Sequence, residues 1–159
     1  MSELQLLEPG TSELGALAAL HATSFEDVWS AQFLSSLLLT PGCFVLRAGA
    51  PSLPAGFVVV RTAADEAEIL TLVVRAELRR RGIARALVEA ASEHAAKLGA
   101  RAMFLEVGAK NEAARSLYRK LGFAAVGERR RYYPSSVGTP EDALTLRAAI
   151  PLGKRRQVG

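Results

Sequence analysis

The stretch Arg79-Arg80-Arg81-Gly82-Ile83-Ala84-Arg85 separates two segments of different hydrophobic periodicity. The run before it, from Glu68 to Val74, is apolar and rich in β-branched residues, which predicts a buried strand. After it, apolar residues recur at helical spacing and Gly99 follows as a stop signal. The residues at this spacing are Ile83, Leu87, Ala91, Ala95 and Leu98. The stretch is therefore predicted to be a basic turn that joins a strand to the start of a helix.

Such a turn is suited to bind an anion. The first N–H groups of a helix have no partner within the helix, and the helix dipole adds positive potential there. Gly82 and Ala84 keep the backbone accessible, and the arginines strengthen the field. The alternative interpretation is a solvated turn without a ligand. The chain has no P-loop motif and no dinucleotide-binding G-x-G-x-x-G motif.

The second half of the chain repeats the strand–helix order. Residues 101–107 predict a strand that carries Glu106 near its end, and Asn111 is a predicted N-cap for a helix that stops at Gly122. Residues 123–126 and 143–150 predict two more strands, with a polar loop between them.

The first third is predicted to hold a strand, two helices and two further strands. These are residues 4–7, 12–21, a helix capped by Ser30, and residues 44–46 and 55–60. The resulting order β-α-α-β-β-β-α-β-α-β-β predicts an α/β (α+β) fold, with a mixed sheet of about seven strands and about four helices.

Composition limits the function classes. We expect one domain over residues 1–150 and a basic tail over 151–159, with a net charge of +4 that suits an acidic cofactor. No signal peptide or membrane-spanning stretch is evident, so we expect a cytoplasmic protein with no membrane partner. Cys43 is the only cysteine, and His21 and His94 are the only histidines. We therefore expect no disulfide and no metal site, and structural roles for these three residues.

Three motifs follow one another along the chain: Arg79-x-x-Gly82-x-Ala84 after a strand, Leu105-Glu106-Val107, and Asn111-x-x-Ala114-x-x-Leu117-Tyr118-x-x-Leu121-Gly122-Phe123. In this order they resemble the GNAT superfamily of acetyl-CoA-dependent N-acetyltransferases. The resemblance covers roughly residues 4–150. Within the superfamily, the chain is similar to the RimI-like branch, whose members acetylate the N-terminal alanine of a small-subunit ribosomal protein. The residues that carry this similarity are Glu106, Asn111, Tyr118, Trp29-Ser30 and Tyr132-Tyr133-Pro134.

The resemblance implies a sheet splayed between its fourth and fifth strands and acetyl-CoA as co-substrate, without metal. The implied cofactor-binding residues are Leu72, Val73 and Val74 on the splayed strand, Arg80, Arg81, Gly82, Ile83, Ala84 and Arg85 on the turn, and Asn111. The implied acceptor-binding residues are Trp29, Tyr132 and Tyr133. Packing is the alternative role for these three aromatic residues, and helix capping is the alternative role for Asn111.

Glu106 and Tyr118 are the predicted catalytic residues. A carboxylate at a strand end can take a proton from the attacking amine, directly or through water, and a neutral phenol can protonate the departing thiolate. A surface carboxylate and a core tyrosine are the alternative roles. An α-amine titrates at about 7.7–8.0 and a lysine at about 10.4, so a protein N-terminus is the easier nucleophile to prepare.

The predicted function is acetylation of a protein N-terminal α-amine, with the alanine of a ribosomal protein as the specific expectation. The alternatives are a GNAT enzyme acting on a small amine and a basic RNA- or ribosome-binding module without catalysis. The chain lacks the strand-borne aromatic motif of RNA-binding modules, so no direct nucleic-acid partner is expected. Gly108 and Val28 depart from the pattern of the RimI-like branch on the presumed acceptor side.

Overall fold

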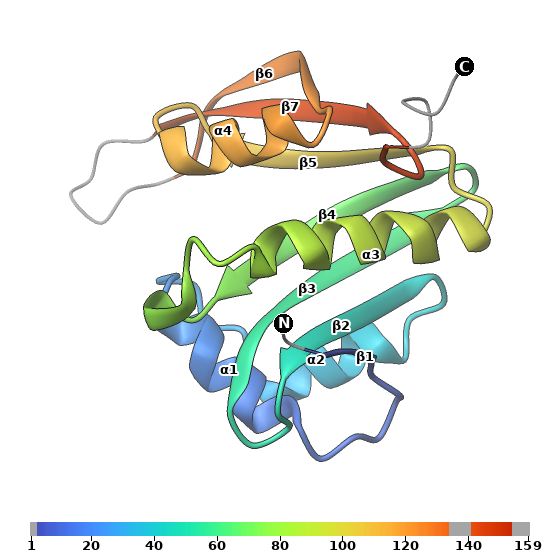
Figure 1. Cartoon of the computed structure of the whole chain (residues 1–159), viewed down its shortest axis with the longest axis vertical. Helices are drawn as coiled ribbons and strands as arrows, with labels where there is room; N and C mark the ends of the chain where they lie inside the picture. Colours follow the sequence, from blue (N-terminus) through green and yellow to red (C-terminus); the bar gives the residue numbers. More distant parts are fainter. Residues whose placement is uncertain (1–2, 134–140, 154–159) are drawn as a thin grey trace.

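A computed structural model describes residues 3–133 and 141–153, and for residues 128–133 and 141 it describes the backbone only. A seven-stranded mixed sheet, in the order β1-β2-β3-β4-β5-β7-β6, is covered by helices on both faces (Figure 1). The strands are β1 (Leu4–Leu6), β2 (Cys43–Gly49), β3 (Pro54–Ala63), β4 (Glu66–Val74), β5 (Ala102–Gly108), β6 (Ala124–Tyr133) and β7 (Glu141–Ala149). The helices are α1 (Leu14–Ala22), α2 (Ala31–Leu38), α3 (Ile83–Lys97) and α4 (Glu112–Lys120), with a 3-10 turn at Ala76–Leu78.

The predicted order of strands and helices is confirmed, and the differences lie at element ends. The strand predicted over 123–126 continues to Tyr133, because β6 pairs with β7 through Glu128 opposite Leu144 and Arg129 opposite Ala143. Pairing with β7, the next strand along the chain, therefore holds in a strand the polar residues that local periodicity assigns to a loop. The placement of Leu98 on the apolar stripe of α3 is wrong, since this residue is the C-cap and 51% exposed.

Each face of the sheet has its own apolar core. Side chains of α1 and α2 pack on one face, and side chains of α3 and α4 pack on the other. The first core contains Leu17, Leu20, Leu34, Val45, Phe57, Val59 and Val73. The second contains Val58, Leu87, Val88, Ala91, Met103, Leu105, Val107, Tyr118 and Leu121. Because strand side chains alternate between faces, membership of a core shows which face a strand residue occupies.

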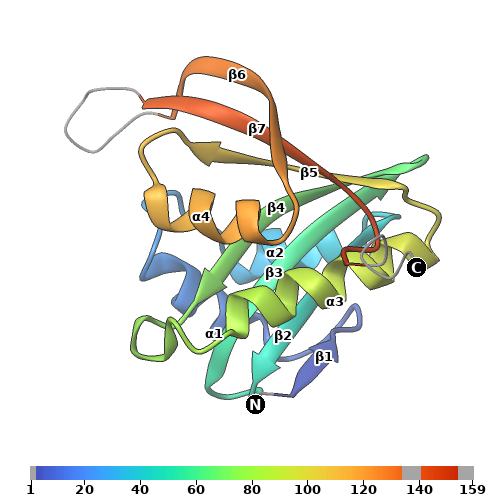
Figure 2. The ribbon, with the colours of Figure 1, turned by 45° about the horizontal axis from the view of Figure 1, so that its top comes forward.

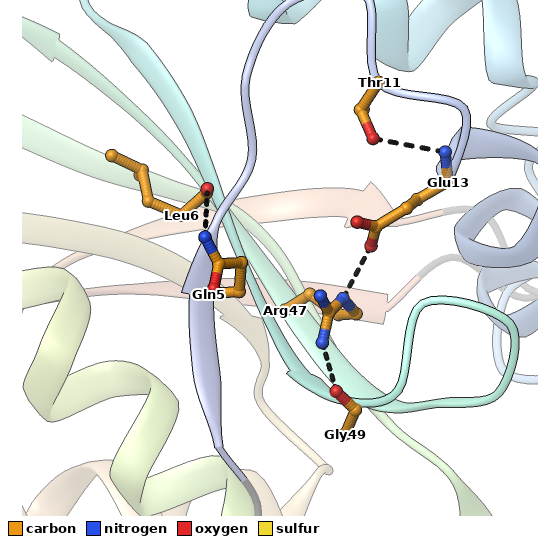
Figure 3. A network of polar contacts seen from close by, with 6 residues as sticks. All are labelled: Gln5, Leu6, Thr11, Glu13, Arg47 and Gly49. Carbon is orange, nitrogen blue, oxygen red and sulfur yellow. Dashed lines mark hydrogen bonds and ion pairs between the residues drawn. The ribbon is translucent and has the colours of Figure 1, made fainter.

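A buried ion pair joins α1 to β2 (Figure 3). Arg47 is 6% exposed, and its Nε donates to Glu13 Oε1 at 2.6 Å. The same guanidinium donates through Nη1 to the carbonyl of Gly49. Glu13 is also held by its backbone N–H, which donates to Thr11 Oγ1 at 3.3 Å. This network ties the start of α1 to the end of β2.

His94 and Cys43 pack against other residues of the fold. His94 meets the ring of Phe44 edge-on at 4.5 Å, in line with its predicted structural role. Cys43 is half-buried rather than fully buried, and desolvation raises the pKa of its thiol. Among residues 3–133 and 141–153, no helix has the length and apolar character needed to cross a membrane, and no group of three potential metal ligands occurs.

Candidate active site

The sheet opens between its two parallel neighbours. β4 pairs with β5 only at Glu66–Glu68 opposite Ala102–Phe104, and beyond these positions the strands diverge (Figure 2). The predicted splay between the fourth and fifth strands is thereby confirmed. The opening lies toward the carboxyl ends of β4 and β5, so it exposes main-chain groups that a continuous sheet would pair.

A β-bulge at Leu70 determines which amides of β4 face this opening. Val59 pairs with Thr71 and Val60 pairs with Ile69, so Leu70 is an extra residue in β4. Beyond the bulge, Arg75 donates its N–H to the carbonyl of Ala55 on β3. Because successive amides along a strand point to alternate sides, this hydrogen bond shows which amides of β4 point to β3 and which point away from it. It follows that the amide of Val73 faces β3, whereas the amides of Leu72 and Val74 face the opening.

The structure therefore divides the predicted trio Leu72, Val73 and Val74. Two of the three amides are directed to where β5 has separated from β4, and the third belongs to the β3–β4 ladder. The carbonyl of Val74 also faces away from β3, because it accepts a hydrogen bond from Arg79 Nε at 3.2 Å.

Glu106 lies on β5, across the opening from β4. Leu105 and Val107 belong to the core under α3 and α4, so the alternating side chain of Glu106 points to the opposite face. Glu106 is half-buried, and the hydroxyl of Thr145, its register partner on β7, lies 3.5 Å from Glu106 Oε2. A partly desolvated carboxylate at a strand end has the placement of a proton acceptor.

Tyr118 lies on the other face of the sheet. It projects from α4 into the core beneath that helix, is 6% exposed, and meets Phe123 edge-on with ring centroids 5.5 Å apart. The predicted core packing of its ring is confirmed. Glu106 and Tyr118 thus lie on opposite faces of the sheet.

The basic turn has two left-handed residues, Arg80 with φ 65° and Gly82 with φ 84°. Gly82 is the N-cap of α3 and provides no side-chain cap, so the amides of the first helical turn are not capped by a side chain. Gly82 and Ile83 line an open pocket together with residues of β1, β2 and α3. The complete lining is Leu4, Ala48, Leu78, Arg81, Gly82, Ile83 and Ala86.

The arginines of the turn differ in their surroundings. Arg80 and Arg81 are exposed. Arg85 is also exposed, and its Nε contacts Glu89 Oε2 at 3.2 Å, one helical turn further along α3. Arg79 instead points back to the end of β4 and to the connection between α1 and α2, where its Nη2 donates to Ser24 Oγ at 3.0 Å.

Asn111 caps α4 as predicted, since its Oδ1 accepts from the N–H of Ala114 at 3.1 Å. The cap uses the carbonyl oxygen of the side chain, and the Nδ2 amide is a separate donor at the same exposed position. The capping role and the predicted cofactor contact are therefore compatible.

Trp29 belongs to a stack of rings on the face that carries Glu106. His21 is sandwiched between Phe25, at 4.6 Å, and Trp29, at 4.9 Å, and Trp29 meets Phe33 edge-on at 4.9 Å. His21 is 2% exposed, and its Nδ1 has no hydrogen-bond partner among the residues that the structure describes. Burial lowers the pKa of His21, and the carboxylate of Asp27 partly opposes this shift.

Sequence reasoning missed His21 and Phe25 as parts of the ring stack, and it missed the contact of Arg79 with Ser24. The ring residues His21, Phe25, Trp29 and Phe33 recur every four positions, which is a signal in the sequence, although Phe25 and Trp29 lie in the connection between α1 and α2. The side chains of Tyr132 and Tyr133, and the whole of Pro134, lie outside the described residues.

Comparison with known proteins assigns this arrangement to a family. The model of the acetyltransferase (GNAT) family matches residues 14–123, which include the turn, Glu106 and Tyr118. The chain belongs to the GNAT family. The structure of the ribosomal-protein-alanine N-acetyltransferase of Escherichia coli superposes with a TM-score of 0.84, at 28% identity and over 100% of both chains.

Other GNAT relatives agree with this assignment. The chain is 38% identical over 98 residues to the [ribosomal protein bS18]-alanine N-acetyltransferase of Escherichia coli, an alignment that covers 62% of this chain and 64% of the relative's length. A Bacillus subtilis relative, to which the same activity is provisionally assigned, is 30% identical over 82% of this chain and 85% of its own length. Arabidopsis thaliana NAA60, solved with acetyl-CoA, shares the fold with a TM-score of 0.80 at 22% identity, over 94% of this chain and 99% of that one.

Proposed function

We propose that this protein is an acetyl-CoA-dependent N-acetyltransferase that acts on a protein N-terminal α-amine, specifically the N-terminal alanine of a small-subunit ribosomal protein. One observation carries the proposal. The β4–β5 opening has the Leu72 and Val74 amides on its β4 side and Glu106 on its β5 side, and Tyr118 lies on the opposite face of the sheet from Glu106. The names of the Escherichia coli and Bacillus subtilis relatives support the choice of acceptor.

The described residues suit acetyl-CoA, which supplies an acetyl group activated as a thioester. The α3 N-terminus, with its left-handed turn at Arg80 and Gly82, offers main-chain donors and positive potential to a diphosphate. Leu72 and Val74 offer amides along an unpaired strand edge, which can hydrogen-bond to an extended ligand as a neighbouring strand would. Asn111 adds its side-chain amide at the start of α4.

The main chain of β4 would polarise the acyl carbonyl. Amides held in a sheet keep their direction without reorganisation, so they stabilise negative charge that develops on an oxygen between the strands. The bulge at Leu70 matters here, because the extra residue changes which amides of β4 point away from β3. As a result the amides of Leu72 and Val74, and not that of Val73, face the opening.

Glu106 would accept the proton of the incoming amine. Its side chain lies on the face that carries α1, α2 and Trp29, so the acceptor is expected to approach from that face. An α-amine with a pKa of about 7.7–8.0 is partly neutral near pH 7. A carboxylate can therefore accept its proton, directly or through water, more easily than it could accept the proton of a lysine ammonium group.

Tyr118 would donate a proton to the departing thiolate from the opposite face of the sheet. A phenol with a pKa of about 10 is protonated at neutral pH and can donate to a thiolate whose conjugate acid titrates at about 8.5. Trp29, Tyr132 and Tyr133 remain proposed acceptor-binding residues on the basis of the family resemblance. Because the proposed base and acid lie on opposite faces of the sheet, the amine would enter on one face while the thiol leaves on the other.

The experiment is a peptide panel incubated with acetyl-CoA and analysed by mass spectrometry. Matched peptides begin with alanine, carry one internal lysine, and have either a free or a blocked N-terminus; small amines form a third set. We expect acetylation at the α-amine of the free alanine peptide, and loss of nearly all product when that amine is blocked. Equal rates for free and blocked peptides, or reaction of small amines only, would contradict the proposal and favour a GNAT enzyme of small amines.

A further inference from the structure

Arg79 connects three segments that are far apart in the sequence. Its Nε donates to the carbonyl of Val74 at the end of β4, and its Nη2 donates to Ser24 Oγ just after α1, 55 positions away. Its own backbone begins the turn at the start of α3, and the next residue, Arg80, has a left-handed conformation. The guanidinium is planar and presents donors in fixed directions, so one side chain can hold both partners at once.

Ser24 is linked through the backbone of His21 and Phe25 to the stack of rings that includes Trp29. The N–H groups of Ser24 and Phe25 both donate to the carbonyl of His21 at 3.1 Å. The Phe25 ring stacks on His21 at 4.6 Å, and His21 stacks on Trp29 at 4.9 Å. A continuous series of contacts therefore runs from the turn at residues 79–82 to Trp29.

We propose that Arg79 is a positioning residue that couples the cofactor-binding turn to the acceptor-side ring stack. A diphosphate held by the amides of residues 80–85 would fix the backbone of the turn, and Arg79 would transmit this restraint through Ser24 to Phe25, His21 and Trp29. The inference rests on the proposed function, because it takes the turn as the acetyl-CoA site. It assigns Arg79 no contact with the reacting atoms.

Trp29 reports on this coupling, because it is the only tryptophan in the chain. The experiment measures acrylamide quenching of tryptophan fluorescence with and without saturating acetyl-CoA, and the Kd of acetyl-CoA by calorimetry. The variants are Ser24→Ala, Arg79→Lys and the double substitution. Arg61→Lys is the control, because Arg61 forms an exposed ion pair with Glu68 at a distance from the turn along β3 and β4.

In the wild type and in Arg61→Lys, acetyl-CoA is expected to lower the quenching constant. In Ser24→Ala and Arg79→Lys the decrease should shrink at least twofold, while the Kd changes by less than about threefold, because the inference assigns neither side chain a contact with acetyl-CoA. The double variant should match the more affected single variant, because both substitutions remove the same link. Unfolding temperatures close to that of the wild type would accompany this pattern.

Two results would overturn the inference: an unchanged quenching constant when acetyl-CoA is added to the wild type, and a full response in Ser24→Ala. If the full response in Ser24→Ala is accompanied by a Kd more than tenfold weaker in Arg79→Lys, Arg79 is instead a ligand of the phosphate. Failure of the wild type to bind acetyl-CoA would instead overturn the proposed function, and the inference with it.

Discussion

At the scale of single residues, Tyr118 combines a core ring with a hydroxyl that the proposed chemistry needs. The ring is packed against Phe123 in the core under α4, so truncation would disturb folding and chemistry together. Only a substitution that keeps the ring can separate the two roles.

Tyr118→Phe should fold as the wild type does and bind acetyl-CoA with a similar Kd. Turnover should fall by roughly 10²–10⁴-fold, the contribution typical of a positioned proton donor. Single-turnover kinetics with the alanine peptide and calorimetry with acetyl-CoA measure the two quantities. Turnover equal to that of the wild type, with chemistry rate-limiting, would leave Tyr118 with a packing role only.

His21 makes stability depend on pH. Desolvation lowers its pKa below the unfolded value of 6.5, against the partial opposition of Asp27, so the folded state disfavours the protonated ring. The stabilisation is complete above pH 6.5 and is lost as the pH falls from 6.5 through the lower folded pKa, because the unfolded chain takes up the proton first. His94, whose pKa is lowered by burial and by Lys97, acts in the same direction.

His21→Phe should keep the stacked rings and reduce this pH dependence. Urea unfolding of the wild type and the variant between pH 5 and 8 measures it, and the difference in unfolding free energy should grow as the pH falls below about 6.5. An equal slope in both proteins would assign the pH dependence to other groups, of which His94 is the first to test.

At the scale of elements, the start of α3 depends on the left-handed backbone of Gly82. Apart from Gly82 itself and its two chain neighbours, no described residue has an atom within 4 Å of a Cβ built there, so a side chain would meet solvent or ligand rather than protein. The φ of 84° is nevertheless strained for any L-residue, and most for a β-branched one.

Gly82→Val should weaken acetyl-CoA binding by at least about tenfold, because the strain of roughly 1–3 kcal/mol would shift the turn that presents the amides. Gly82→Asn should be milder, since asparagine tolerates the left-handed region. Gly99→Val is the control, because Gly99 has φ 106° at the other end of α3 and also has no protein atom within 4 Å of a built Cβ. It should lower the unfolding temperature and leave the Kd unchanged; a Kd unchanged in Gly82→Val as well would rule out the turn as the cofactor site.

At the scale of the whole molecule, the helical layer over β1–β4 is joined to the sheet by the Arg47–Glu13 pair. The chain contains a matched exposed pair, Arg61–Glu68, with the same 2.6 Å separation. The side chains of the first pair are 7% and 16% exposed, and those of the second are 53% and 41% exposed. The two pairs differ mainly in burial, so a difference between their contributions to the free energy of unfolding can be attributed to burial.

Arg47→Met should lower the unfolding free energy by about 3 kcal/mol, because it leaves the Glu13 carboxylate without its buried partner. Arg61→Met should change it by less than about 1 kcal/mol, as expected for a solvated pair. Denaturant unfolding of both variants measures the contrast. Equal losses would show that the 2.6 Å contact, and not its burial, determines the contribution.

Much of the site could be predicted from local sequence. Ser30 and Asn111 cap their helices as predicted, with side-chain oxygens that accept from Phe33 at 3.0 Å and from Ala114 at 3.1 Å. These features depend on a few neighbouring residues, and so do the strand–turn–helix order around Gly82 and the position of Glu106 near a strand end. The strand of residues 124–133 was only half predicted, because its polar part is extended by β7 rather than by its own periodicity.

The sequence by itself thus determined the order of elements, the basic turn before α3, and the residue types available for acyl transfer. Only the tertiary structure decided how they face one another: the Leu70 bulge that turns the Leu72 and Val74 amides to the opening, the placement of Glu106 and Tyr118 on opposite faces, and the link from Arg79 to Ser24. The physical reason is range. Caps and turns are formed between residues a few positions apart, whereas strand register, sheet splay and the contact between residues 24 and 79 depend on groups that only folding brings together.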